Sequence, residues 1–405
     1  NGEGNILVQT KEDKIQYKIE KDKNLYSFKT LLEVKDNPFL IDIIGYKKNQ
    51  NQKTSINLEG TYLFQRQIKI DKFSLKEGNN KINLENLFLN KNFKIVNFKK
   101  FELDYLDVDK IKNEINIINE DETYLVKGTM LNVNNFIDNI IKNKNGKKKH
   151  LFSKNLNLNI KIDKVYIDQD NTIKNLIGIL NFENNNMSKA QLDASFSKGK
   201  KLNFTVNTSN NEKVTTLFLD RAEPLVRRYK FIKGFRNGSL DFHSIKKGKK
   251  SSSTIKIYDF KLKELPALTK LLTLASLQGI ADLLSGNGIT FNEFEMNYRN
   301  KDKGLIIDEI YAIGPSISIL MDGYIENDKL ISLRGTLVPA TTINKAIGSI
   351  PLLGKILVGG KTGEGVFGVS FKIKGPPKEL ETTVNPIKTL TPRFITRTLE
   401  KIKKN

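Results

Sequence analysis

The feature that most constrains the fold of this 405-residue chain is a period-two alternation of apolar and polar residues, which recurs from Thr54 onward. Such alternation is typical of β-strands that have one apolar and one polar face. It is found at residues 68–75, 81–89, 156–162, 165–167, 202–206, 239–242, 254–262 and 368–373. Because these segments occur along most of the chain, the sequence predicts a mainly β protein.

Turn residues separate the alternating segments. Gly, Asn, Asp and Glu cluster at residues 77–80 and 326–328, as in hairpin turns. We therefore expect an antiparallel meander, and residues 1–53, whose alternation is weak, are expected to begin the same sheet. A few short helices are also predicted, and their candidate segments are residues 132–141, 221–229, 266–284, 341–357 and 387–402.

The composition favours a structure with much surface per residue over a compact ball. Apolar residues make up 38% of the chain, and the mean hydropathy is −0.40. A net charge of +22 is compatible with an anionic membrane or nucleic acid as partner. However, Lys, Asn and Ile dominate throughout, as an AT-rich genome would produce. The Phe residues alternate with polar residues as in a sheet, so no nucleic acid is predicted as partner.

Motifs for catalysis or metal binding are incomplete in this sequence. The absence of cysteine excludes disulfides, thiolate metal sites and Cys nucleophiles. The Gly-Lys-Thr at residues 360–362 resembles part of a phosphate-binding loop, but Lys355 stands where that loop needs a glycine. Residues 168–179 open like a calcium loop and lack its later Gly and Glu. Since the two histidines, His150 and His243, have no catalytic spacing, we predict no enzymatic activity, metal or cofactor.

Two apolar runs toward the C-terminus are too short to cross a bilayer. The 11 uncharged residues between Lys270 and Asp282 would span about 16 Å as a helix, which is about half of a hydrocarbon core. This run and residues 347–358 are expected either to plug the end of the sheet or to lie at a membrane interface. The candidate membrane-contact residues are Leu271, Leu272, Leu274, Leu277, Ile350, Leu352, Leu353, Ile356 and Leu357.

An ordered set of motifs connects these apolar runs. It comprises the Leu-rich run 266–284, Gly286-Asn287-Gly288, Val338-Pro339-Ala340, the segments 349–354 and 365–376, Val384-Asn385-Pro386 and residues 391–394. Upstream matches occur at residues 218–222, Tyr229, Gly234 and 238–240. The set resembles the C-terminal region of the AsmA-like envelope proteins of the YhdP and TamB type, over roughly residues 150 to 398. Arg221-Ala222 departs from the Ala-Gly usual in that family after the preceding Asp.

The resemblance implies both a fold and a function. The fold would be an elongated, twisted antiparallel sheet that curls into an open apolar groove, with residues 1–150 as a groove segment of a longer protein and residues 151–405 as the AsmA-like C-terminal region. The function would be non-enzymatic transfer of phospholipids between the inner and outer membranes of a Gram-negative bacterium. The protein would lie in the periplasm, anchored at the inner membrane by an upstream segment, with its C-terminal end near the outer membrane.

Acyl chains need a lining of apolar side chains, because each exposed methylene costs about 0.8 kcal/mol in water. For each lining candidate, the alternative is packing against helices or a second sheet. A different class of function is also open, a structural or assembly factor for outer-membrane proteins that acts through exposed sheet edges. The candidate lining residues are Ile68, Ile70, Phe73, Leu75, Leu156, Leu158, Ile160, Ile162, Leu202, Phe204 and Val206.

Overall fold

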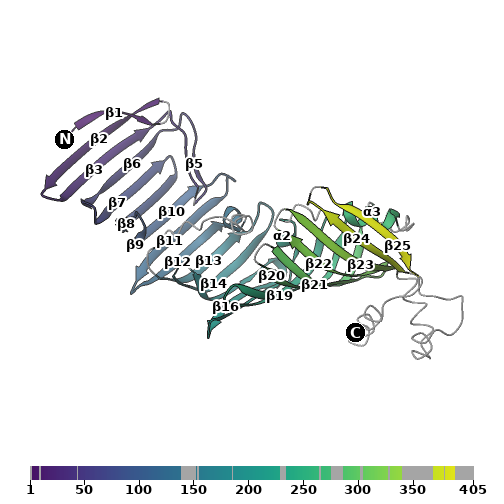
Figure 1. Ribbon diagram of the computed structural model, residues 1–405. Helices are drawn as coiled ribbons and strands as arrows, with labels where there is room; N and C mark the ends of the chain where they lie inside the picture. The colour runs from purple at the N-terminus through teal and green to yellow at the C-terminus, as the bar shows by residue number, and fades with distance from the viewer. Residues whose placement is uncertain are drawn as a thin grey trace, which may run out of the picture. The chain divides into compact units, whose positions relative to one another are not determined.

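The computed structural model describes residues 2–8, 11–42, 44–137, 152, 155–184, 186–228, 234–263, 266–274, 286–301, 304–326, 329–339, 368–377 and 379–387. Within these residues the protein is mainly β, as predicted, with 25 strands (Figure 1). Twenty-three strands belong to one twisted, mostly antiparallel sheet, and β4 (Phe39–Ile41) and β5 (Tyr46–Lys48) form a separate two-stranded sheet. The chain divides into two compact units, Asn1–Asn207 and Thr208–Asn405, which we describe separately.

Unit 1 contains the first part of the sheet. Hydrogen-bonded pairs follow the order β1, β2, β3, β6, β7, β8, β10, β11, β12, β13, β14, β15 and β16, and β9 pairs with the end of β8. The first three strands confirm that residues 1–53 begin the sheet. The bounds are β1 (Gly2–Val8), β2 (Lys11–Asp22), β3 (Leu25–Val34), β6 (Thr54–Leu63), β7 (Gln67–Glu77), β8 (Asn80–Asn90), β9 (Ile95–Asn97), β10 (Lys100–Leu106), β11 (Lys112–Glu120), β12 (Thr123–Asn132), β13 (Leu156–Tyr166), β14 (Thr172–Glu183), β15 (Asn186–Ser195) and β16 (Lys201–Ser209).

The expected meander is wrong at one junction of unit 1. Strands β12 and β13 pair in parallel, whereas their neighbours pair antiparallel. A parallel pair cannot be joined by a hairpin, because the chain must return to the edge from which the first strand started. The parallel pairing of β12 with β13 therefore makes the sheet mixed.

Unit 2 contains nine strands that pair antiparallel in sequence order over the described pairs from β17 to β25. Connections of two or three residues join several of them, which suits a meander. The bounds are β17 (Glu212–Leu219), β18 (Arg236–Lys247), β19 (Lys250–Leu262), β20 (Ile289–Lys301), β21 (Gly304–Ile313), β22 (Ile317–Glu326), β23 (Leu330–Pro339), β24 (Gly368–Gly375) and β25 (Glu381–Ile387).

The helices of the described residues are short. They are the 3₁₀ turn η1 (Ser197–Gly199), α2 (Glu223–Val226) and α3 (Pro266–Leu274), with a further helical turn at residues 134–137. Thus the predicted helices at 132–141, 221–229 and 266–284 are each confirmed in part. The predicted helix 341–357 lies outside the described residues. Of the segment 387–402, only Ile387 is described, and it ends a strand.

Candidate functional site

All four candidate lining residues of β7 lie on the same face of the sheet. Strict alternation would place Ile68 and Ile70 on one face and Phe73 and Leu75 on the other, because Ile70 and Phe73 are three positions apart and only even steps keep a side chain on the same face. The register between β6 and β7 shifts at this point, which leaves Asp71 as an extra residue. Such a β-bulge reverses the alternation beyond it. The apolar side chains on both sides of Asp71 therefore point the same way.

One apolar row crosses nine strands of unit 1, because directly paired residues share a face of a sheet. This row, called row 1 here, runs from β7 to β16 and includes candidates from three separate stretches of sequence. It consists of Phe73, Leu84, Phe101, Ile117, Val126, Ile160, Gly178, Leu192 and Phe204.

The same registers place the other candidates of β13 and β16 on this face. Leu158 connects through Leu180 and Ala190 to Val206, and Leu202 lies two residues from Phe204 in the same strand. All eleven candidate lining residues thus share one side of the unit 1 sheet, the apolar face. The residues of row 1 from β8, β10, β11, β12 and β15 were missed at the sequence level, although Phe101, Leu103 and Tyr105 alternate clearly.

The candidates differ in burial on the apolar face. Leu75, Ile162 and Val206 are buried by the protein, and the other eight are half-buried. Leu156, Leu158 and Ile70 pack beside a buried cluster of Leu87, Phe98 and Tyr124, so the segment around β9 covers part of the face. Packing inside the protein, the alternative weighed for each residue, thus accounts for three candidates fully and for others in part.

Residues 35–53 cover one end of the apolar face. Tyr46 is fully buried, and its ring meets that of Tyr105 edge to face, with centroids 5.8 Å apart. The Tyr46 hydroxyl donates a hydrogen bond of 2.7 Å to the Glu77 carboxylate. Lys48 is buried as well, where its Nζ donates 2.9 Å hydrogen bonds to the carbonyls of Lys35 and Asn49. Burial lowers the pKa of Lys48. This segment therefore buries Tyr46 and Lys48 against the end of the apolar face.

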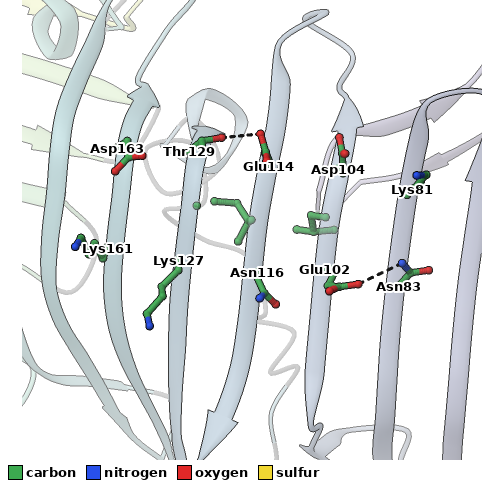
Figure 2. Close-up of a pocket in the computed structure, with 13 residues that line it drawn as sticks. Lys81, Asn83, Glu102, Asp104, Glu114, Asn116, Lys127, Thr129, Lys161 and Asp163 are labelled. Carbon is green, nitrogen blue, oxygen red and sulfur yellow. Dashed lines mark hydrogen bonds between the residues drawn. The ribbon is translucent and has the colours of Figure 1, made fainter.

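The opposite face of unit 1 is polar. A row of Ser74, Asn83, Glu102, Asn116, Lys127 and Lys161 runs parallel to row 1 on that side. A shallow pocket of about 600 Å³ lies here, over β8 and β10 to β13. Figure 2 shows its side chains in two rows across successive strands. The pocket is therefore on the polar face, and an apolar groove is not demonstrated.

Hydrogen bonds and ion pairs already occupy much of this polar pocket. Asn83 donates to Glu102 at 3.4 Å, and Thr129 donates to Glu114 at 2.7 Å (Figure 2). The pKa of Glu102 is lowered, chiefly by a hydrogen bond from Lys100. Within the described ranges, no group of three or more His, Asp or Glu side chains is placed to hold a metal ion.

Unit 2 also has an apolar row, called row 2. It crosses eight strands from β17 to β24, and most of its members are buried, in contrast to row 1. It consists of Leu219, Leu240, Ile257, Phe294, Ala312, Ile319, Leu337 and Val369. Next to this row, Phe260 stacks between Phe235 and Phe291, with both centroid distances at 5.3 Å.

Helix α3 contains the candidate membrane-contact residues that the structure describes. Leu271 and Leu272 are 2% and 0% exposed, and Leu268 is also buried. The helix contacts β25. This end of the apolar run is therefore packed against protein. The side chain of Leu274 and the residues Leu277, Ile350, Leu352, Leu353, Ile356 and Leu357 lie outside the described part of the chain.

Comparisons with known proteins do not identify the chain. No protein-family model, curated protein or solved structure matches it. No helix among the described residues has the length and apolar character needed to cross a bilayer. The structure establishes the architecture, which is a long, mostly antiparallel sheet with an apolar and a polar face in unit 1.

Proposed function

We propose that this protein is a non-enzymatic lipid-transfer protein that holds the acyl chains of phospholipids on the apolar face of unit 1. The observation that carries the proposal is row 1. Eight of its nine residues are only half-buried, although they are apolar or Gly and lie side by side across nine strands. Three of them, Leu84, Phe101 and Ile117, pack beside the buried cluster of Leu87, Phe98 and Tyr124, so the proposal rests mainly on the part of the row from β13 to β16. Large contiguous apolar surface is uncommon on monomeric proteins and marks binding sites.

The chemistry of the two faces supports an acyl ligand. A surface of Phe, Leu, Ile and Val side chains offers dispersion contacts and no hydrogen-bond partner, which suits methylene chains. The opposite face carries Lys, Asn, Asp and Glu and stays hydrated. A lipid on the apolar face could keep its headgroup at an edge of the sheet in water. Curling of the sheet around the chains would turn this face into a groove.

The AsmA-like resemblance extends the proposal to a cellular setting. Phospholipid would pass between the inner and outer membranes through the periplasm, along apolar lining and without a catalytic residue. Unit 2 holds most of the motifs of the resemblance and would form the end near the outer membrane. For Leu271 and Leu272 to contact a membrane, α3 would have to leave its packed position.

Native mass spectrometry of the gently purified chain tests the proposal. We expect bound phospholipid on the parent protein and its loss in the double variant Leu158→Asp/Ile160→Asp, because the charges face the acyl chains. The matched control is Asn157→Asp/Asn159→Asp, which adds the same charges to the opposite face of the same strand. The control should keep its lipid.

Circular dichroism separates loss of lipid from loss of fold in these variants. Leu158 has protein neighbours, so a second variant, Phe204→Asp, with Thr205→Asp as its control, places the charge outside the Phe98 cluster. A parent protein without lipid, or lipid retained by both folded apolar-face variants, would contradict the proposal.

The sheet edges leave an assembly function as a second candidate. Among the described strands, β25 has β24 as its hydrogen-bonded neighbour on one side only. An edge of this kind can add a strand from another chain. Capture of an unfolded outer-membrane barrel protein by lipid-free protein would favour assembly over lipid transfer.

A further inference from the structure

Three hairpin turns of unit 1 lie next to one another on one side of the sheet, where the strands end. This side is different from the unpaired edge of an outer strand. The turn between β2 and β3 is bounded by Leu25, which pairs with Leu63 at the start of the turn between β6 and β7. Gln67 closes that turn and pairs with Asn90, where the turn between β8 and β9 begins. The backbone N–H of Phe64 donates a 2.9 Å hydrogen bond to Asn24, which joins the first two turns directly. We call these turns the basic edge.

Each turn of the basic edge exposes a large apolar side chain. Leu25 is 40% exposed, Phe64 50% and Phe93 71%. Behind Phe64, an aromatic row extends into the apolar face, since Tyr62 lies 6.2 Å from Phe64 and 6.1 Å from Tyr26 between ring centroids. Apolar tips backed by tyrosines are typical of protein surfaces at the boundary between water and lipid.

The charge at these turns is positive. Five basic residues accompany one acidic residue, Asp22, and they are Lys21, Lys23, Arg66, Lys91 and Lys94. The Nζ of Lys21 lies 5.4 Å from the centroid of the Tyr26 ring. Long basic side chains can cover an apolar surface while their charges reach anionic phosphates.

Two other described turns of unit 1 lack this combination. The turn at residues 106–110, on the opposite edge of the sheet, exposes Leu106 and Val108 but also contains Asp107 and Asp109. The hairpin that follows the basic edge on its own side of the sheet, at residues 120–122, is Glu-Asp-Glu without an apolar tip. The pairing of exposed apolar tips with positive charge is therefore a property of the three adjacent turns.

Phe93 occupies an unfavourable backbone conformation for its type. Its φ is +57°, in the left-handed region that glycine adopts without strain. A bulky aromatic side chain that is 71% exposed gains little from packing at this position. Its presence is better explained by a contact outside the folded chain.

We propose that the basic edge docks unit 1 onto the surface of an anionic phospholipid bilayer, with Phe64, Phe93 and Leu25 inserted among the headgroups. This surface is distinct from the C-terminal candidates and does not depend on acyl chains being held on the apolar face. If both functions occur, docking brings the tyrosine end of that face next to lipid.

The absence of tryptophan in the chain makes the insertion directly measurable. In the full chain, Phe93→Trp places one reporter at the basic edge, and Val108→Trp places one on the opposite edge as control. With phosphatidylglycerol vesicles we expect a blue shift of emission for Phe93→Trp and none for Val108→Trp. Phosphatidylcholine vesicles should give a smaller shift. No shift at position 93, or equal shifts at both positions, would overturn the proposal.

A charge series tests whether the basic residues at this edge direct docking. Arg66→Gln/Lys91→Gln should weaken binding to phosphatidylglycerol vesicles about thirtyfold, from about fivefold for each basic residue near the surface. Lys246→Gln/Lys249→Gln removes the same charge from a hairpin of unit 2 and should have much less effect. Equal weakening would mean that only net charge matters and would refute docking by this edge. Vesicle binding measures docking, whereas bound lipid in native mass spectra measures the proposed transfer function, so the two proposals can fail independently.

Discussion

Rows 1 and 2 are built from the same kind of residue but differ in burial. In row 1, Val126 is buried and the other eight residues are half-buried, whereas in row 2 seven of eight residues are buried and Phe294 is half-buried. Four consecutive buried residues, Glu309 to Ala312 and again Ile317 to Leu320, show that β21 and β22 are covered on both faces. Alternation alone does not determine whether an apolar face is core or surface. The elements that cover it do.

This contrast separates the two units by how much of their apolar surface is covered. The stacked rings of Phe235, Phe260 and Phe291 are buried in unit 2, and α3 contacts β25. Among the described residues of unit 1, residues 35–53 and the segment around β9 provide cover of this kind. A ligand that needs apolar surface therefore finds it in unit 1, and unit 2 is the better-packed unit.

The largest expected effect compares one Phe from each unit. Phe291 is 1% exposed and stacked on Phe260, so Phe291→Ala should destabilise the protein by about 3–5 kcal/mol. Phe204 is half-buried in row 1, and Phe204→Ala should cost about 1 kcal/mol, because the ring loses only part of its burial. Urea denaturation of both variants measures the difference. Equal losses would mean that the apolar face of unit 1 is as well packed as unit 2.

Much of the apolar face could be predicted from the sequence. Alternation at residues 68–75 and 156–162 identified residues that lie on the same face, although they are far apart in the chain. The β-bulge was less accessible, because only the register with β6 shows that Asp71 is extra. The burial of Tyr46 against Tyr105 could not be predicted, since the two residues are far apart in the sequence and no local pattern joins them. The parallel pairing of β12 with β13 left no local signal either.

A smaller effect is expected from loosening the cover of unit 1. Asp13 anchors the start of residues 35–53, because its carboxylate accepts hydrogen bonds from the Lys35 backbone N–H at 2.8 Å and the Asn37 amide at 2.6 Å. Asp13→Asn should cost about 1–3 kcal/mol at neutral pH, as hydrogen bonds to a charged group are lost. Hydrogen exchange should rise over residues 35–53, and Tyr46, which is fully buried in the parent protein, should become accessible.

The pH dependence of this variant has a defined sign. Burial raises the pKa of Asp13, but the hydrogen bonds outweigh it and lower the pKa below 3.8. The carboxylate therefore stabilises the fold above that value, and this stabilisation is lost as the pH falls through the folded-state pKa. The difference in unfolding free energy between parent and Asp13→Asn should shrink from pH 7 toward acid. A constant difference would show that Asp13 acts through shape alone.

The smallest expected effect on stability is a gain instead of a loss, and it comes from a substitution at the basic edge. Phe93→Gly should stabilise unit 1 by up to about 1 kcal/mol, because glycine adopts a φ of +57° without strain. The same change should reduce binding to phosphatidylglycerol vesicles, since an apolar tip is lost. Lys110→Gly, with a φ of +59° on the opposite edge, is the matched control and should gain stability with little loss of binding. If Phe93→Gly instead destabilises the protein and leaves vesicle binding intact, Phe93 serves the fold, and the open face of unit 1 has no docking edge at this turn.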